Sequence, residues 1–462
     1  MRRNHQTGAL ALLLAASLLT SGCSGIRLPD TSSSGTSGAA AESTAAEKAK
    51  SMVHWVAETF GLNRAAESME STSADSSAAA VTGSSDDTGS SGGTQNIYFS
   101  LLPEEMDERY QDNLPDGDSL FINNASFYYY YSVISDSQKA IYDGLLALVQ
   151  HPDSTEYRKK IELDYDPSGD VFQVDFNYAY KALIADHPEL FWFSQNGGLF
   201  QYYYSGNRQS NGKYAVMLQL EQTYDNAEAE MTTFNQAVSD FMSNIDLTQS
   251  QPMIALQIHD RLIDMVTYDD DLAATTEASG DVTDYGYTAY GALVANSRGE
   301  ANTAVCDGYS YAFEYLCQQA GLEVTRITGK AGASTESMGG HSWNLIHYDD
   351  DQWYEVDATW DDQEPEISAD DPHAALYQEA ISDAAYWGKI RHYLFNVTTD
   401  TISSFNPGDE YTYYAPDGSY ASFLGSSVHV RDNGSDPSTG DVLTCKAPVA
   451  YGTQYAYASL VG

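Results

Sequence analysis

Cysteine, basic side chains and long apolar runs are all scarce in this chain. Only four cysteines occur in 462 residues, which excludes a dense disulfide framework, and none of them are paired at the spacing of a zinc site. Lysine and arginine number 22 against 66 aspartates and glutamates, for a formal charge of −44. We therefore expect neither nucleic acid nor an anionic membrane surface as a partner.

The clearest apolar run, Ala9 to Leu19, lies near the N-terminus and follows the basic stretch MRRNHQTG. A membrane-spanning helix needs roughly 20 apolar residues, so this run is too short to cross a bilayer. A basic stretch, a short apolar run and small residues together predict a secretory signal peptide over residues 1–22.

The small residues before Cys23 resemble a bacterial lipobox, although Thr20 stands where that motif usually has Leu, Val or Ile. The resemblance implies a secreted lipoprotein that is anchored at the bacterial cell surface through a lipid on Cys23. The membrane is then a partner only through this N-terminal anchor. An ordinary secretory signal is the alternative.

Serine, glycine, alanine, threonine and aspartate dominate the chain after Cys23. This composition buries too little apolar surface to offset the entropy lost on ordering, so residues 23–95 are predicted to form a disordered tether. The remainder is long enough for two domains or for one elaborated domain. We expect an N-terminal α+β region over residues 96–250, a second domain over 251–405 and a β-rich C-terminal segment over 406–462.

Helical and strand patterns alternate irregularly in the folded part, which predicts an α+β fold rather than repeated strand–helix–strand units. Apolar residues at helical spacing predict helices, and two β-rich runs around a polar loop predict a hairpin. The helices are expected within residues 135–152, 176–193, 225–245 and 252–270, and the hairpin within residues 199–224.

An acidic loop has part of the pattern of a calcium-binding EF-hand loop. Its candidate ligands are Asp164, Asp166, Ser168, Asp170 and Asp175. The last of these is an aspartate, where such loops usually have a longer glutamate that binds through both oxygens. The loop has no second copy, so a plain acidic turn is the alternative, and we expect no other metal or cofactor.

One cysteine, Cys306, stands at the start of a predicted helix. Apolar residues follow it on one helical face, at Tyr309, Ala312, Phe313, Leu316 and Ala320. A helix N-terminus favours a thiolate over a thiol, and its N–H groups can hold a developing oxyanion. Cys317 lies roughly 16 Å further along the helix, too far to form a disulfide with Cys306. A buried structural cysteine is the alternative role.

A nucleophilic cysteine needs a base and a group that orients the base. The segments HSWNLIH and WYEVDAT predict two paired strands joined by an acidic turn. If His347 pairs with Asp351, His341 stands directly opposite Asp357. A shift by two residues makes His341 and Asp357 diagonal neighbours on one face, whereas a shift by one separates them.

Three segments resemble the signature blocks of the transglutaminase-like superfamily, whose members are related to papain-like cysteine proteinases. The segments are VCDGYSYAF, GHSWN and WYEVDATWDD, and the resemblance covers roughly Met253 to Asp362. It implies a papain-like α+β core in which a helix bearing cysteine packs on an antiparallel sheet bearing histidine and aspartate. It also implies that residues 251–405 form the catalytic domain, with Cys306 as nucleophile, His341 as general base and acid, and Asp357 as the residue orienting His341.

Two aromatic residues are candidates for the oxyanion or substrate site, namely Tyr290 in the segment AYGAL and Trp343 beside His341. Trp353 and Trp360 also lie near Asp357 in the sequence, and bulky rings of this kind can line a substrate tunnel. Packing in the core is the alternative for these aromatic residues.

The resemblance implies a cell-surface enzyme that transfers acyl groups from protein or peptide amides through a thioester. An amine acceptor gives transamidation, and water gives hydrolysis. A cysteine peptidase or amidase of wall or surface peptides is therefore an alternative. A third hypothesis is that the protein is a catalytically silent binding module, since its 35 tyrosines can supply a binding surface.

Overall fold

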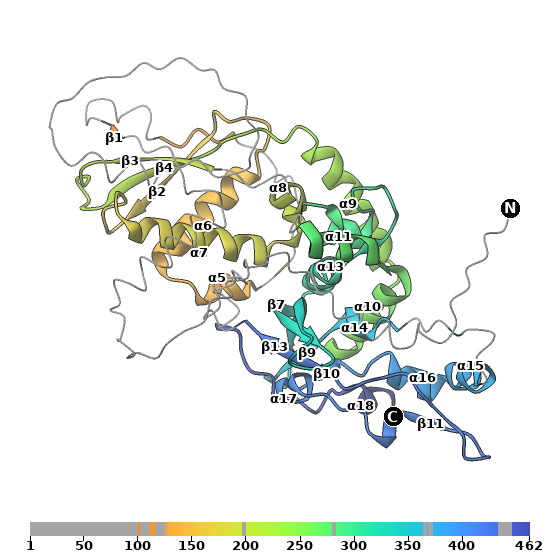
Figure 1. Cartoon of the computed structure of the whole chain (residues 1–462). Helices are drawn as coiled ribbons and strands as arrows, with labels where there is room; N and C mark the ends of the chain where they lie inside the picture. The colour runs from red at the N-terminus through yellow and green to blue at the C-terminus, as the bar shows by residue number, and fades with distance from the viewer. Residues whose placement is uncertain are drawn as a thin grey trace, which may run out of the picture.

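The computed structural model describes residues 100–101, 111–115, 125, 127–195, 200–279, 283–363, 367, 373–432 and 446–462. The predicted signal peptide, Cys23, the tether over residues 23–95 and Cys445 lie outside these ranges. Within them the chain mixes helices with largely antiparallel sheets, as expected of an α+β fold (Figure 1). No helix in the described part is both long and apolar enough to cross a bilayer.

The N-terminal region forms a four-stranded sheet with the strand order β1-β3-β4-β2. The strands are β1 (Ser100–Leu101), β2 (Arg158–Leu163), β3 (Phe200–Ser205) and β4 (Tyr214–Leu220). The predicted hairpin is confirmed, since β3 pairs antiparallel with β4 from Phe200 opposite Leu220 to Tyr204 opposite Val216. The short strand β1 instead pairs parallel with β3.

Four helices overlap the predicted segments. They are α6 (Asp136–Val149), α7 (Asp170–Asp186), α9 (Ala227–Met242) and α10 (Gln251–Met265). Helix α7 begins at Asp170, ahead of the expected segment 176–193 and within the candidate calcium loop. Helix α6 begins in a capping box, in which the side chains of Ser135 and Gln138 each accept a hydrogen bond from the other residue's backbone N–H. Such reciprocal bonds satisfy two N–H groups that a helix start otherwise leaves unpaired.

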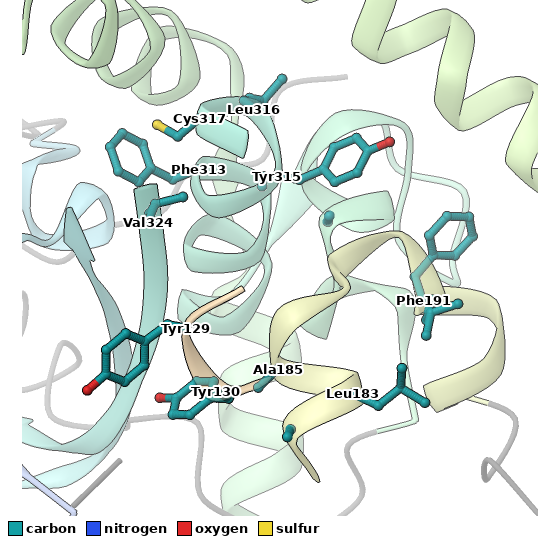
Figure 2. Close-up of a cluster of buried hydrophobic side chains, with 14 of the residues drawn as sticks. Tyr129, Tyr130, Leu183, Ala185, Phe191, Phe313, Tyr315, Leu316, Cys317 and Val324 are labelled. Carbon is teal, nitrogen blue, oxygen red and sulfur yellow. The ribbon is translucent and has the colours of Figure 1, made fainter. Parts of the chain in front are cut away.

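Helix α13 (Cys306–Gln319) lies between the N-terminal region and the second sheet (Figure 1). Figure 2 shows its residues Phe313, Tyr315 and Cys317 with Val324 of strand β7 (Glu323–Gly332) on one side and Leu183 and Phe191 of the N-terminal region on the other. One apolar cluster runs from Tyr129 to Phe395. This cluster contains residues from both sides of position 250, and the predicted domain boundary there stays a prediction.

The second sheet has five strands in the order β10-β9-β8-β7-β13. Besides β7 they are β8 (Gly339–His347), β9 (Trp353–Val356), β10 (Phe395–Val397) and β13 (Val428–Arg431). Strand β10 pairs antiparallel with β9, with Phe395 opposite Val356. Strand β13 belongs to the predicted C-terminal segment, yet it pairs with β7 from Val428 opposite Gly332 to Arg431 opposite Gly329. Strand β13 thus forms one edge of this sheet, whereas β11 (Thr412–Tyr414) and β12 (Tyr420–Ser422) of the same segment form a separate two-stranded sheet.

Shorter elements surround these two sheets. The helices are α5 (Tyr129–Val133), α8 (Phe191–Gln195), α11 (Asp270–Ser279), α12 (Ala289–Leu293), α14 (Ala358–Asp361), α15 (Ala374–Ser382), α16 (Ala384–Ile390), α17 (Thr399–Ser403) and α18 (Tyr457–Val461). Short 3-10 turns are η2 (Pro188–Leu190), η3 (Tyr285–Tyr287) and η4 (Asp409–Tyr411). Strands β5 (Thr267–Tyr268) and β6 (Thr303–Ala304) pair parallel, and β11 (Thr412–Tyr414) pairs antiparallel with β12 (Tyr420–Ser422).

Candidate active site

Cys306 is the first residue of α13 and is almost completely buried. The helix start fits tightly against the preceding segment, because a Cβ atom on Gly308 would lie 2.7 Å from the carbonyl oxygen of Gly286 and 3.0 Å from that of Thr288. Only glycine permits this close approach of backbone to backbone. Glycine at position 308 therefore allows the first turn of α13, which begins with Cys306, to pack directly against η3 and the start of α12.

The Cys306 sulfur is disulfide-bonded in this structure. Cys317 is a free, buried cysteine, in agreement with the prediction that it lies too far along the helix to pair with Cys306. A thiolate, and not a disulfide, is the nucleophile in cysteine chemistry. Cys306 therefore requires reduction before it can act.

His341 and Asp357 are brought together by strands β8 and β9. The register places His347 opposite Trp353, not opposite Asp351, so His341 and Asp357 are diagonal neighbours on one face. His341 Nε2 lies 2.7 Å from Asp357 Oδ2, and both side chains are buried. A histidine held through Nε2 has Nδ1 left to exchange a proton with a nucleophile. The place of the Cys306 sulfur relative to that nitrogen stays a prediction.

The two carboxylate oxygens of Asp357 contact different groups. Oδ1 accepts hydrogen bonds of 3.1 Å from the backbone N–H groups of Thr359 and Trp360, which makes Asp357 the N-cap of α14. Oδ2 faces His341 and also lies 2.9 Å from Nε2 of His429. Burial raises the pKa of Asp357, but the charge and hydrogen bond of His341 and the contact with His429 outweigh it and hold the pKa below its ordinary value.

His429 is a site residue that the sequence did not reveal. It lies on β13 opposite Ala331 of β7, and it is completely buried. Burial lowers the pKa of His429 more than Asp357 raises it. Its Nδ1 is buried without a hydrogen-bond partner, which places the single proton of the neutral ring on Nε2. His429 is therefore a neutral donor to Asp357 Oδ2.

Two tryptophan rings enclose this pair of histidines. The Trp343 ring stacks on His341 at 5.9 Å between centroids, and Trp360 lies 5.9 Å from His341 and 4.8 Å from His429. The Trp343 Nε1–H donates to Glu355 Oε2 at 2.6 Å. That donor is thus occupied, and Trp343 forms a wall beside His341.

Two other aromatic candidates pack away from His341 in contacts of their own. The Tyr290 ring on α12 packs against Phe191, Phe234 and Tyr285. Trp353 packs against Tyr129 and His347. The oxyanion role of Tyr290 stays a prediction.

The candidate calcium ligands have other partners in the structure. Asp164 is exposed and lies 3.8 Å from the Lys213 ammonium, and Asp166 Oδ1 accepts a hydrogen bond from the Ser168 N–H. Asp170 is the first residue of α7. Both oxygens of Asp175 accept hydrogen bonds, at 2.9 Å from the Gln138 amide and at 2.8 Å from the Tyr165 hydroxyl. Calcium binding at this loop stays a prediction.

Comparisons with known proteins give little further information. No family model matches the chain, and no curated protein matches it. A solved structure described as "Crystal structure of a TGase" is 15% identical with a TM-score of 0.23, and the match covers 38% of this chain and 56% of that chain. A likeness this weak carries no argument about activity, so the chemistry of the site has to be argued from the residues themselves.

Proposed function

We propose that this protein is a cysteine acyl-transfer enzyme with a transglutaminase-like, papain-like core. Cys306 is the nucleophile, His341 the general base and acid, and Asp357 the residue that orients His341. The observation that carries the proposal is the buried 2.7 Å contact between His341 Nε2 and Asp357 Oδ2. Its support is the position of Cys306 at the start of α13, where helix N–H groups favour a thiolate.

The mechanism follows from these positions. The Cys306 thiolate attacks an amide carbonyl carbon, and backbone N–H groups at the start of α13 stabilise the oxyanion that forms. His341 then donates its proton to the leaving amine, which breaks the carbon–nitrogen bond and leaves a thioester on Cys306. Asp357 stabilises the imidazolium form of His341 during this step.

The acceptor of the acyl group decides the overall reaction. An amine that attacks the thioester gives transamidation, whereas water gives a free acid and a cysteine peptidase or amidase activity. We propose protein or peptide amides at the cell surface as the substrates, reached through a lipid anchor on Cys23. An acidic chain of formal charge −44 attracts cationic acceptors such as lysine side chains.

The disulfide of Cys306 favours a second function. A cysteine held in a stable disulfide has no thiolate, and the fold then serves as a binding module for a surface partner. The two functions differ in one measurable property, which is the acidity of the Cys306 thiol after reduction.

The test is the rate of Cys306 alkylation by iodoacetamide as a function of pH, followed by mass spectrometry of the peptide that contains Cys306. The full chain is compared with and without prior reduction, and Cys317→Ser serves as the matched control for the other described cysteine. We expect reaction only after reduction, and persisting well below the ordinary thiol pKa of about 8.5. We also expect it to be lost in His341→Ala and strongly reduced in Asp357→Asn.

A reduced Cys306 that titrates near pH 8.5 in all variants, or never reacts, would overturn the enzyme and favour the binding module. If the activated thiol is present, labelled primary amines supplied together with a glutamine-containing peptide distinguish transamidation from hydrolysis. Incorporation of the amine supports the first, and release of ammonia without incorporation supports the second.

A further inference from the structure

A second cluster of histidine and carboxylate side chains lies outside the candidate active site. It consists of His259 and Asp260 on α10 and His392, which lies between α16 and β10. One ligand atom from each lies within 4.8 Å of the others. His259 is completely buried, and the side chain of His392 is 8% exposed. The proposed acyl transfer does not use these three residues.

Each histidine of the cluster has one ring nitrogen held by an acceptor. His259 Nε2 lies 3.1 Å from Asp361 Oδ2, and Asp361 Oδ1 in turn accepts a hydrogen bond of 2.9 Å from the Leu394 N–H. His392 Nδ1 lies 2.6 Å from the carbonyl oxygen of Gly388. A carbonyl oxygen only accepts, so Nδ1 of His392 carries a proton.

The other nitrogen of each ring faces the same oxygen of Asp260. His259 Nδ1 lies 3.2 Å from Asp260 Oδ1, and His392 Nε2 is in close contact with the same atom. A carboxylate oxygen donates no proton. His392, with one proton fixed on Nδ1, therefore faces Asp260 either as an imidazolium or with a lone pair that a shared cation can accept. His259 offers a second such lone pair on Nδ1 when its proton lies on Nε2, toward Asp361.

We propose that His259 Nδ1, His392 Nε2 and Asp260 bind one divalent transition-metal ion, with zinc as the best fit. Two imidazoles and one carboxylate are a donor set that zinc accepts, with a fourth position left for water. A histidine ligand typically donates its other N–H to a carboxylate or a backbone carbonyl. Asp361 and the Gly388 carbonyl oxygen supply these two acceptors.

The separation of the ligand atoms and the exposure of the Asp260 side chain are compatible with a bound zinc ion. Tetrahedral zinc with bonds of about 2.0–2.1 Å places neighbouring ligand atoms about 3.3 Å apart, close to the 3.2 Å between His259 Nδ1 and Asp260 Oδ1. The distance between His392 Nε2 and Asp260 Oδ1 has to increase when the ion binds. The Asp260 side chain is 45% exposed and borders a surface cavity of about 480 Å³, so an ion and its water can enter from solvent.

The cluster around Asp357 does not meet the same conditions. His341, Asp357 and His429 also place three ligand atoms within 4.8 Å of one another. Nδ1 of His429, however, is buried without an acceptor, so the proton of the neutral ring stays on Nε2, where a metal would have to bind. In the α10 cluster, by contrast, both outer nitrogens have an acceptor for their proton, the Gly388 carbonyl oxygen for His392 and Asp361 for His259.

Protons compete with the metal at this site. A histidine binds a metal ion only as a neutral ring, so protons compete with the ion for His259 Nδ1 and His392 Nε2. The charged and titratable groups facing the His259 ring are Asp260, Asp361 and His392. Metal binding releases any extra proton on these rings, so we expect the affinity to rise with pH.

The experiment is a titration of the full chain with Co²⁺, followed by displacement with Zn²⁺, without reductant so that Cys306 stays in its disulfide. Visible absorption of the cobalt complex reports coordination, and elemental analysis reports stoichiometry. We expect one metal ion per chain, binding tighter at pH 8 than at pH 6. Asp260→Asn and His392→Ala each alter a proposed ligand, so we expect them to weaken binding by at least the roughly 10–100-fold that loss of an outer-shell partner costs.

His347→Ala is the matched control, because His347 also lies near two carboxylates, Glu323 and Asp351, but outside the cluster. It is expected to leave the affinity unchanged, and the far-ultraviolet circular dichroism of each variant checks its folding. No binding by the unmodified chain would overturn the proposal. So would binding that Asp260→Asn leaves intact, or binding that is lost in His341→Ala and kept in His392→Ala.

Discussion

His429 Nε2 lies 2.9 Å from Asp357 Oδ2, although the two residues are 72 positions apart in the chain. This contact joins β13, at the edge of the sheet, to the carboxylate that also contacts His341. Asp357 is thus held by two histidines on one oxygen and by the N-terminus of α14 on the other. We regard His429 as a positioning residue.

Replacing His429 tests this role. In reduced protein, His429→Ala is expected to slow Cys306 alkylation at pH 7 by about 10-fold, equivalent to about 1.4 kcal/mol, because Asp357 loses one of its donors. Asp357→Asn is expected to slow it more. His429→Gln restores an N–H donor and should recover part of the rate. A drop in thermal stability with an unchanged pH profile of alkylation would indicate a purely structural role.

Trp343 is expected to stabilise the fold through Glu355. The Trp343 Nε1–H donates to Glu355 Oε2, while Arg431 and Thr399 contact Oε1 of the same buried carboxylate. Trp343→Phe keeps a ring beside His341 but removes this donor, so we expect the free energy of unfolding to fall by about 1–3 kcal/mol. Urea denaturation of both single variants and the double variant with Glu355→Gln measures the coupling. Strictly additive effects would contradict the prediction.

Gly308 is expected to tolerate no side chain. Alanine is a better helix former than glycine by about 1 kcal/mol, yet its Cβ would lie 2.7 Å from the Gly286 carbonyl oxygen and 3.0 Å from the Thr288 carbonyl oxygen. We expect Gly308→Ala to lower the free energy of unfolding by about 1–3 kcal/mol.

Gly169→Ala is the control for this substitution, because a Cβ on Gly169 meets no atom within 4 Å. Its effect should stay within about 1 kcal/mol, as for other changes at a helix N-cap. Thermal and urea denaturation measure both variants. Equal stability of Gly308→Ala and the unmodified chain would show that the start of α13 can shift.

Asp186 is expected to make the protein less stable as the pH rises. Burial raises the pKa of its carboxyl group to about 7, against the hydrogen bonds that it accepts from the Tyr130 and Tyr131 N–H groups. The folded state therefore binds a proton more tightly than the unfolded state, and stability is lost between the unfolded pKa of about 3.9 and the folded one. The loss is on the order of 4 kcal/mol.

Asp186→Asn removes this titration, although the amide can accept with only one oxygen. The measurement is the free energy of unfolding at pH 5 and at pH 8 for both proteins. We expect the unmodified chain to lose more stability than Asp186→Asn between the two values. Glu314, whose pKa is also raised by burial, adds a loss of the same sign to both. Parallel changes in the two proteins would contradict the prediction.

Much of the core around Cys306 could be predicted because its signals are local. Apolar spacing and the residues at its ends define α13, and Gly321 follows it with a φ of 77°, a conformation that glycine adopts easily. Side chains alternate between the two faces along β8 and β9, so only some pairing registers of these strands place His341 and Asp357 on one face. The observed register is one of those that keep them on one face.

The contacts of His429 and of the α10 cluster could not be predicted in the same way. The segment VHVR reads as a short strand, but nothing in its composition says which strand it pairs with. His392 follows α16 and meets Asp260 132 residues away. Such pairings depend on how the whole core closes, since contacts between distant segments are set by packing and not by local propensity.

The sequence by itself determined the helix that begins at Cys306 and the hairpin that carries His341 and ends before Asp357, because both follow from the periodicity of neighbouring residues. The tertiary structure alone decided that β13 joins the sheet and that His429 shares Asp357 with His341. It also decided that Cys306 is held in a disulfide. These features link residues far apart in the chain, and they form only when burial of one common core brings those segments together.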